Sequence, residues 1–108
     1  MKTGDVILIP FPYAEANDVK VRPAVVVTLT KDKYKDIVVC AISSVLPKQA
    51  SKFEILLSPS SKNKLRIKSV LKVDRIVTLK VENKIADLGE LDSKDLSAFI
   101  KTFKSLVD

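Results

Sequence analysis

Arg22 is the first residue of the chain whose type and position could serve chemistry. It precedes Pro23, and a residue before proline is restrained to an extended backbone, which suits the start of a strand. Its guanidinium is planar, permanently charged and suited to a phosphate or to the pentacoordinate phosphorus of a phosphoryl transition state. Arg22 is therefore a candidate for binding a phosphodiester, although an exposed arginine at a strand edge gives the same pattern.

Hydroxyl and charged side chains later in the chain could join it. Ser43 and Ser44 follow the apolar run 38–42, and hydroxyls at a strand end can bind phosphate oxygens or orient a ribose 2′-hydroxyl, or simply form a turn. Lys72 and Asp74 alternate with apolar residues, so a strand there places both on one face. A cation beside a carboxylate can divide acid and base roles at a phosphodiester, or form an ordinary surface ion pair.

Histidine is absent and Cys40 is the only cysteine. The chain thus lacks the usual general base and the His and Cys ligands of zinc sites, so we expect no metal and no other cofactor. A single thiol fits a reducing compartment. Residues 1–5 lack the apolar segment of a signal peptide, and no apolar run is long enough to span a bilayer. We therefore expect a cytoplasmic protein with no membrane partner.

The positive charge is concentrated in the middle of the chain. The net charge is +6, and residues 31–68 alone hold nine basic and three acidic side chains, which equals that excess. A basic surface attracts a polyanion by steering and counterion release, whereas the ordinary alternative is a lysine-rich solvated face.

The elements that must position these residues are mainly strands. The expected strands are 5–9, 22–29, 36–42, 53–57 and 69–79, with a short one near 84–88. Pro10-Phe11-Pro12 is expected to end the first strand, and residues 13–20 to form a polar loop. Residues 96–107 then carry apolar side chains at helical spacing, with Asp92 as the N-cap. We predict one domain, 1–108, mainly β: a small antiparallel barrel with a C-terminal helix.

Four blocks of the sequence resemble the MazF/PemK family of toxin ribonucleases. They are Gly4-Asp5-Val6-Ile7, Val21-Arg22-Pro23-Ala24-Val25-Val26, Ala41-Ile42-Ser43-Ser44 and the run Ser69–Leu79. The resemblance implies an SH3-like barrel of the MazF/Kid/CcdB type and a homodimer. It implies metal-independent, sequence-specific cleavage of single-stranded RNA by attack of the 2′-hydroxyl, leaving 2′,3′-cyclic phosphate and 5′-hydroxyl ends. Its inhibitor would be a cognate antitoxin with an acidic, flexible tail.

The resemblance also suggests roles for individual residues. Arg22 matches the catalytic arginine, Ser43 stands where the family has a catalytic threonine or serine, and Lys72 and Asp74 match an acid–base pair of some members. The residues that we assign to RNA contact are Tyr13, Lys20, Ser44, Lys48, Lys52 and Arg75.

The chain departs from the family pattern at several positions. Ser43 replaces the usual threonine, Arg75 stands where glutamine is frequent, and Val77 stands where arginine is frequent. Lys64-Leu65 replaces a common Gly-Leu before the last long strand. These changes could alter the RNA sequence that is cut, or reduce activity.

Two alternatives to an active ribonuclease remain open at this point. A CcdB-like toxin would share the fold but poison DNA gyrase by binding, using surface residues of the terminal helix instead of Arg22 and Ser43. A degenerate family member would bind nucleic acid without cutting it, with strong salt dependence.

Overall fold

The computed structural model describes the backbone of residues 1–12 and 19–108 and the side chains of residues 1–11 and 20–108. Its strands are β1 (Asp5–Pro12), β2 (Val19–Leu29), β3 (Ile37–Ser43), β4 (Glu54–Leu57), β5 (Ser69–Leu79) and β6 (Ala86–Glu90). Helix α1 (Ser93–Lys104) follows, and short 3₁₀ helices occupy Val81–Asn83 and Ser105–Val107.

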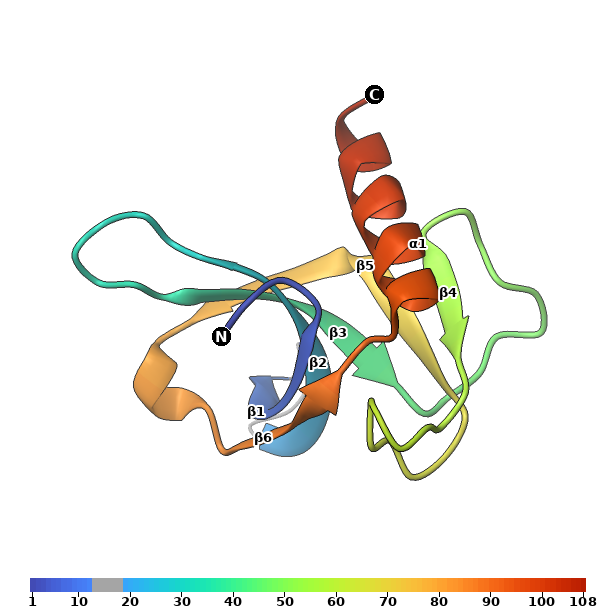
Figure 1. Ribbon diagram of the computed structural model, residues 1–108, viewed down its shortest axis with the longest axis horizontal. Helices are drawn as coiled ribbons and strands as arrows, with labels where there is room; N and C mark the ends of the chain where they lie inside the picture. Colours follow the sequence, from blue (N-terminus) through green and yellow to red (C-terminus); the bar gives the residue numbers. More distant parts are fainter. Residues whose placement is uncertain (13–18) are drawn as a thin grey trace.

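The six strands form one antiparallel sheet in the order β4-β5-β3-β2-β1-β6. The sheet curls into a half-barrel, and α1 lies beside β4 and β5 (Figure 1). The predicted mainly β barrel with a C-terminal helix is therefore confirmed. In the described part of the chain, no helix has the length and apolar character needed to cross a membrane.

Both faces of the central strands are buried. Alternate side chains of a strand point to opposite faces, and each set packs in its own core cluster. In β3, Cys40 and Ile42 belong to a cluster that also contains Phe99 of α1, whereas Val39 and Ala41 belong to a second cluster. This explains why the sequence of β3 is a continuous apolar run. Burying a side chain of the size of Phe99 contributes about 1.5–3 kcal/mol to stability.

Helix α1 begins where the sequence places its cap. Asp92 has an extended backbone, and its carboxylate accepts a hydrogen bond of 2.8 Å from the backbone N–H of Asp95. Leu91 before the cap and Leu96 in the first turn both pack on the core that contains Phe99. Burial, with the nearby negative charge of Asp92, raises the pKa of the Asp95 carboxyl.

The prolines do not end β1, contrary to expectation. The strand continues to Pro12 and pairs Pro10 with Val21 of β2. The carbonyl of Leu8 accepts a hydrogen bond from the backbone N–H of Ile85, just before β6, so the backbone polar groups of Leu8 and of Pro10 face that side. Pairing with β6 stops at Leu8, and the missing N–H of Pro10 therefore points to an open edge. β2 likewise begins earlier than predicted, at Val19, and β6 lies slightly later.

β5 covers the predicted residues but does not remain regular. Cys40 of β3 pairs with Ile76, whereas the next residue, Ala41, pairs with Lys72. Three residues of β5 are therefore inserted where β3 has none, which bends the strand as a bulge does. The strand begins with three buried residues, burial alternates from Leu71 to Asp74, and Arg75 and Ile76 are then both exposed.

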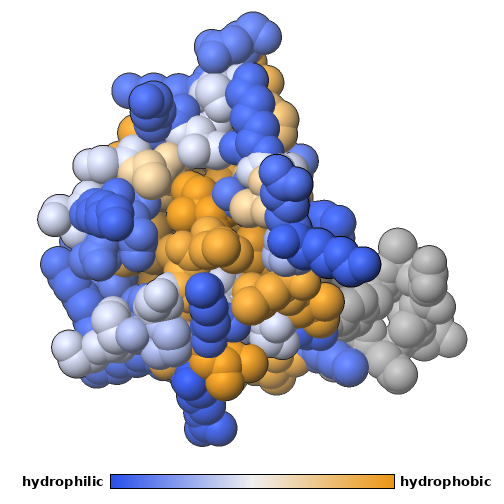
Figure 2. Space-filling view, turned by 90° about the vertical axis from the view of Figure 1, so that its right-hand side faces the viewer, coloured by the Kyte–Doolittle hydropathy of each residue, from blue (hydrophilic) through white to orange (hydrophobic). Residues whose placement is uncertain are grey.

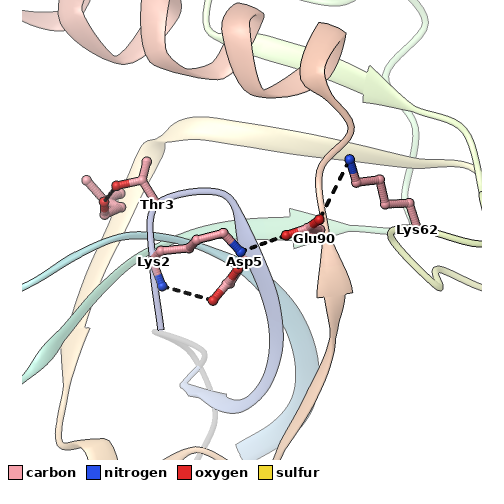
Figure 3. A network of polar contacts seen from close by, with 6 residues as sticks. Lys2, Thr3, Asp5, Lys62 and Glu90 are labelled. Atoms are coloured by element: carbon pink, nitrogen blue, oxygen red, sulfur yellow. Dashed lines mark hydrogen bonds and ion pairs between the residues drawn. The ribbon is translucent and has the colours of Figure 1, made fainter.

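An ionic network fixes the N-terminus against β6 (Figure 3). The Lys2 ammonium donates to Asp5 Oδ1 at 2.9 Å and to Glu90 Oε2 at 2.7 Å, and the Lys2 backbone N–H donates to the other oxygen of Asp5. The Lys62 ammonium lies 3.6 Å from Glu90 Oε1. These bonds raise the pKa of Lys2 and, chiefly through Lys2, lower the pKa of the Glu90 carboxyl. The network joins the N-terminus, β6 and the loop before β5.

Candidate functional site

A pocket of about 180 Å³ lies where β1, β2, β3 and β5 meet, and we call it the central pocket. Its lining contains three cationic side chains and one hydroxyl on an apolar base. The lining residues are Phe11, Arg22, Ala41, Ile42, Ser43, Val45, Lys72 and Arg75. Arg22, Ser43 and Lys72, which lie far apart in the sequence, are thus brought to one pocket.

Strand pairing explains how these residues converge. Arg22 of β2 pairs with Ile9 of β1, whose side chain is fully buried. Lys72 pairs with Ala41, two residues before Ser43 on β3. Both Arg22 and Lys72 are partly exposed, which leaves their charged groups accessible to a ligand.

Ser43 is the last residue of β3 and starts a tight turn. Its hydroxyl oxygen accepts a hydrogen bond of 3.1 Å from the backbone N–H of Val45. The hydroxyl proton is not used in that bond, so Ser43 can still donate to an anionic oxygen in the central pocket.

The two acidic groups associated with β5 lie outside the pocket lining. Asp74 is exposed, and its negative charge adds to burial in raising the pKa of the Cys40 thiol to about 12. Glu54 pairs with Lys72 from β4, and its carboxylate accepts a hydrogen bond of 2.8 Å from the backbone N–H of Ser51. That bond, together with the Lys72 ammonium, lowers the pKa of the Glu54 carboxyl. Sequence reasoning missed Glu54, because only the pairing of β4 with β5 reveals it.

A second, larger pocket of about 380 Å³ adjoins the first, and we call it the lateral pocket. It shares Arg22 and Ile42 with the central pocket. The remaining lining residues are Leu8, Val21, Pro23, Ser44, Lys64, Leu65, Arg66, Ile67, Ser69 and Leu88. Lys64 and Arg66 were counted in the basic middle of the sequence but not recognised as site residues; their nearness to Leu65 and Ile67 in a basic, apolar stretch was the available signal.

The loop that carries Lys64 is held by one buried side chain. Asn63 is 2% exposed, and its Oδ1 accepts hydrogen bonds from the backbone N–H groups of Ser60 (3.0 Å) and Leu65 (2.9 Å). Its Nδ2 donates to the carbonyl of Ser58 at 2.9 Å. Lys64 itself has φ 56°, in the left-handed region that favours glycine. That conformation accounts for the glycine expected here from the family pattern.

β6 fixes the same loop by close approach. The backbone N–H of Glu90 donates to the carbonyl of Lys62 at 3.0 Å. A Cβ on Gly89 would lie 2.1 Å from that carbonyl oxygen, so only glycine allows the contact. The backbone that carries Lys64 and Arg66 is therefore fixed by β6 as well as by Asn63.

The electrostatics of the two pockets favour an anionic ligand. Within the described residues, no carboxylate lines either pocket, whereas Arg22, Lys64, Arg66, Lys72 and Arg75 do. Apolar surface accompanies this charge. Figure 2 shows apolar residues framed by hydrophilic ones on the face that carries β4 and its neighbouring loops. Exposed apolar side chains of this region are Val45, Leu46, Leu56 and Ile67, of which Val45 lines the central pocket and Ile67 the lateral one.

The remaining residues predicted for RNA contact are dispersed. Ser44 lines the lateral pocket and Arg75 the central pocket. Lys48 and Lys52 are exposed between β3 and β4 and line neither pocket, and the Lys52 ammonium lies 5.4 Å from the ring centroid of Phe53. Lys20 is exposed on β2. Tyr13 lies outside the described residues.

The described residues offer no cluster of three or more His, Cys, Asp or Glu side chains that could hold a metal ion.

Comparison with known proteins gives two findings. The family model described as PemK-like, MazF-like toxin of type II toxin–antitoxin system matches residues 2–107. Among solved structures, the fold is similar to an endoribonuclease in complex with its cognate antitoxin from Mycobacterial species, with a TM-score of 0.71 and 13% sequence identity over 99% of this chain and 94% of that one. No curated protein matches the chain.

Proposed function

Because the chain belongs to the family of PemK-like, MazF-like toxins of type II toxin–antitoxin systems, we propose that it is an endoribonuclease that cleaves single-stranded RNA at the central pocket. The observation that carries the proposal is the convergence of Arg22, Ser43 and Lys72 on one pocket without a lining carboxylate. A phosphodiester is an anion whose charge grows during cleavage, and such a pocket stabilises that growth. The structural neighbour, described as an endoribonuclease, supports the proposal.

Cleavage is proposed to proceed by attack of the ribose 2′-oxygen on the adjacent phosphorus. The 2′-O–P bond forms, the bond from phosphorus to the 5′-oxygen breaks, and the products are a 2′,3′-cyclic phosphate and a 5′-hydroxyl. Arg22 and Arg75 would bind the non-bridging oxygens, whose negative charge increases in the transition state. Ser43 would donate a hydrogen bond from its hydroxyl to the same phosphate. None of these steps needs a metal ion, and we propose that the reaction is metal-independent.

The 2′-hydroxyl must lose a proton and the 5′-oxygen must gain one. We assign the donor to Lys72, which lines the pocket, and the acceptor to Asp74, the only carboxylate of β5. Glu54, which pairs with Lys72 from β4 and also lies outside the lining of the central pocket, is the competing acceptor. The variants Asp74→Asn and Glu54→Gln separate these assignments. The pH–rate profile should lose its acidic limb only in the variant that lacks the general base.

Lys20, Lys48, Lys52 and Tyr13 are proposed to contact the RNA beyond the cleaved bond. Exposed lysines outside the pockets attract the phosphate backbone without reading sequence. Replacing Lys48 or Lys52 by alanine should weaken binding uniformly across sequences and reduce the salt dependence by about one counterion each.

The proposed partners are RNA, a second copy of the chain and a cognate antitoxin. The structural neighbour was solved in complex with its antitoxin, which supports a protein inhibitor here. A net charge of +6 favours an acidic, flexible antitoxin segment laid over the basic pockets. Because we propose that it acts on RNA, we also propose that the protein works in the cytoplasm.

The test is cleavage of a long single-stranded RNA in EDTA with analysis of the product ends. The wild type should cut at a short sequence and leave cyclic phosphates, and Arg22→Ala should lower the rate about 10²–10³-fold. Ser43→Ala should also be slow, whereas Ser43→Thr should stay active because it keeps the hydroxyl.

Lys94→Ala is the matched control, because Lys94 is an exposed lysine of α1 that lines neither pocket. Intact RNA from a folded, antitoxin-free wild type would overturn the proposal. Inhibition of DNA gyrase by the same preparation would then identify a CcdB-like toxin, and salt-dependent RNA binding without turnover a degenerate family member.

A further inference from the structure

We propose that the lateral pocket is a base-binding subsite and that Arg66 determines which base it accepts. The proposal rests on the proposed function, because it assumes that the nucleic acid bound at the central pocket is RNA. It goes beyond that function by assigning sequence selection to named residues of the loop before β5.

The first observation behind this proposal is that the two pockets are continuous. Arg22 and Ile42 line both, so the guanidinium that would bind the scissile phosphate stands at the boundary between them. A nucleotide adjoining that phosphate is covalently held within reach of the lateral pocket. The two pockets therefore suit consecutive parts of one strand and not two independent ligands.

The second observation is the mixture of apolar and cationic residues that line the lateral pocket. Leu8, Leu65 and Leu88 give it apolar walls from three separate segments, while Lys64 and Arg66 are both exposed. A phosphate alone gains nothing from the apolar walls. A base has an apolar face and a polar edge, and this pocket offers surface for both.

The charged groups of this pocket select among base edges. Lys64 and Arg66 can only donate hydrogen bonds, and the described lining contains no carboxylate to accept one. Guanine presents two adjacent acceptors, O6 and N7, which match the guanidinium fork, whereas adenine and cytosine place an amino donor on the corresponding edge. The geometry points to guanine at the nucleotide adjoining the cut, with Arg66 as the residue that reads it.

Rigidity of the loop is the third step, because a side chain can discriminate bases only if its backbone is fixed. Asn63 holds the loop with three hydrogen bonds, and the backbone N–H of Glu90, which donates to the Lys62 carbonyl beside Gly89, fixes it to β6. Arg66 follows Leu65, whose side chain is 8% exposed and belongs to the core cluster. The backbone directly before Arg66 is therefore fixed by hydrogen bonds at Lys62 and Asn63 and by packing of Leu65 in the core.

The experiment is to map cleavage of a random-sequence RNA library by the wild type, Arg66→Ala, Arg66→Lys and the control Lys94→Ala. The wild type and Lys94→Ala should prefer guanine at one position next to the cut. Both Arg66 variants should reduce that preference about ten- to hundredfold and leave preferences at other positions unchanged. Arg66→Lys is decisive, because it keeps the charge that attracts phosphate but loses the bidentate fork.

Two results would overturn the proposal: an unchanged base preference in Arg66→Lys, or an Arg66→Ala that slows cleavage equally at every sequence. The second identifies Arg66 as a phosphate contact. Selection of bound molecules from a 2′-fluoro library, which lacks the attacking hydroxyl, separates the subsite from the proposed function. Guanine enrichment that depends on Arg66, without any RNA cleavage, supports the subsite and refutes the ribonuclease; cleavage without Arg66-dependent selection does the reverse. If neither RNA cleavage nor Arg66-dependent guanine enrichment is observed, both proposals are refuted.

Discussion

Replacement of Asn63 by alanine should destabilise the fold through the loop before β5. Asn63 is 2% exposed and makes three side-chain hydrogen bonds, two accepted from backbone N–H groups and one donated to a carbonyl. An intramolecular hydrogen bond contributes about 1 kcal/mol net, and a buried partner left unpaired costs about 1–3 kcal/mol. Some of the freed groups lie near the surface and can bind water, so the expected loss is about 2–4 kcal/mol in the free energy of unfolding.

Ser69→Ala is the matched comparison, since Ser69 is also buried and polar but makes one hydrogen bond, from its hydroxyl to the carbonyl of Ile67. It should cost about 1 kcal/mol. Urea unfolding followed by far-UV circular dichroism measures both, because the chain has no tryptophan for fluorescence. Equal slopes against urea are required for the comparison.

The reasoning is refuted if Asn63→Ala costs no more than Ser69→Ala. A further check is hydrogen exchange at the backbone N–H of Leu65, which loses its partner in Asn63→Ala and should exchange faster than in the wild type.

Three other perturbations test separate parts of the structure. Gly89→Ala should lower stability by about 2–4 kcal/mol, because its Cβ would lie 2.1 Å from the Lys62 carbonyl oxygen; an unchanged urea midpoint would contradict the contact. The Cys40 thiol, whose pKa burial raises to about 12, should react with Ellman's reagent only as the protein unfolds, and stoichiometric reaction in native buffer would disprove its burial. The Glu90 carboxyl, whose pKa is lowered chiefly by Lys2, stabilises the fold above about pH 4.3 and loses that contribution as the pH falls through its folded pKa. Lys2→Met should therefore flatten the stability profile between about pH 5 and pH 3, and parallel wild-type and variant profiles would argue against the ion pair.

Much of the fold was predictable because its signals are local. A run rich in apolar and β-branched residues predicted the extent of β5, and the cap at Asp92 predicted the start of α1. The start of β1 at Asp5 was predicted correctly but its end was not, since whether a strand tolerates Pro10 depends on which neighbour its edge faces. No property of the residues themselves reveals where β6 stops pairing.

The candidate site divides in the same way. Arg22, Ser43 and Lys72 could be proposed from residue type and position, and the structure brings all three to the central pocket. Asp74 was expected beside Lys72, but it lies outside the lining while Arg75 lies within it. Asp74 and Arg75 belong to the residues that β5 inserts opposite Cys40 and Ala41.

The sequence by itself determined the strand and helix types, the cap of α1, the surplus of positive charge and the residues able to bind a phosphodiester, because each depends on residue identity or near spacing. Only the tertiary structure decided the bulge of β5, the pairing of Glu54 with Lys72 and the lateral pocket. These arise from hydrogen bonds and packing between segments distant along the chain. Their register is chosen by the sum of all contacts in the sheet, and no local pattern encodes that sum.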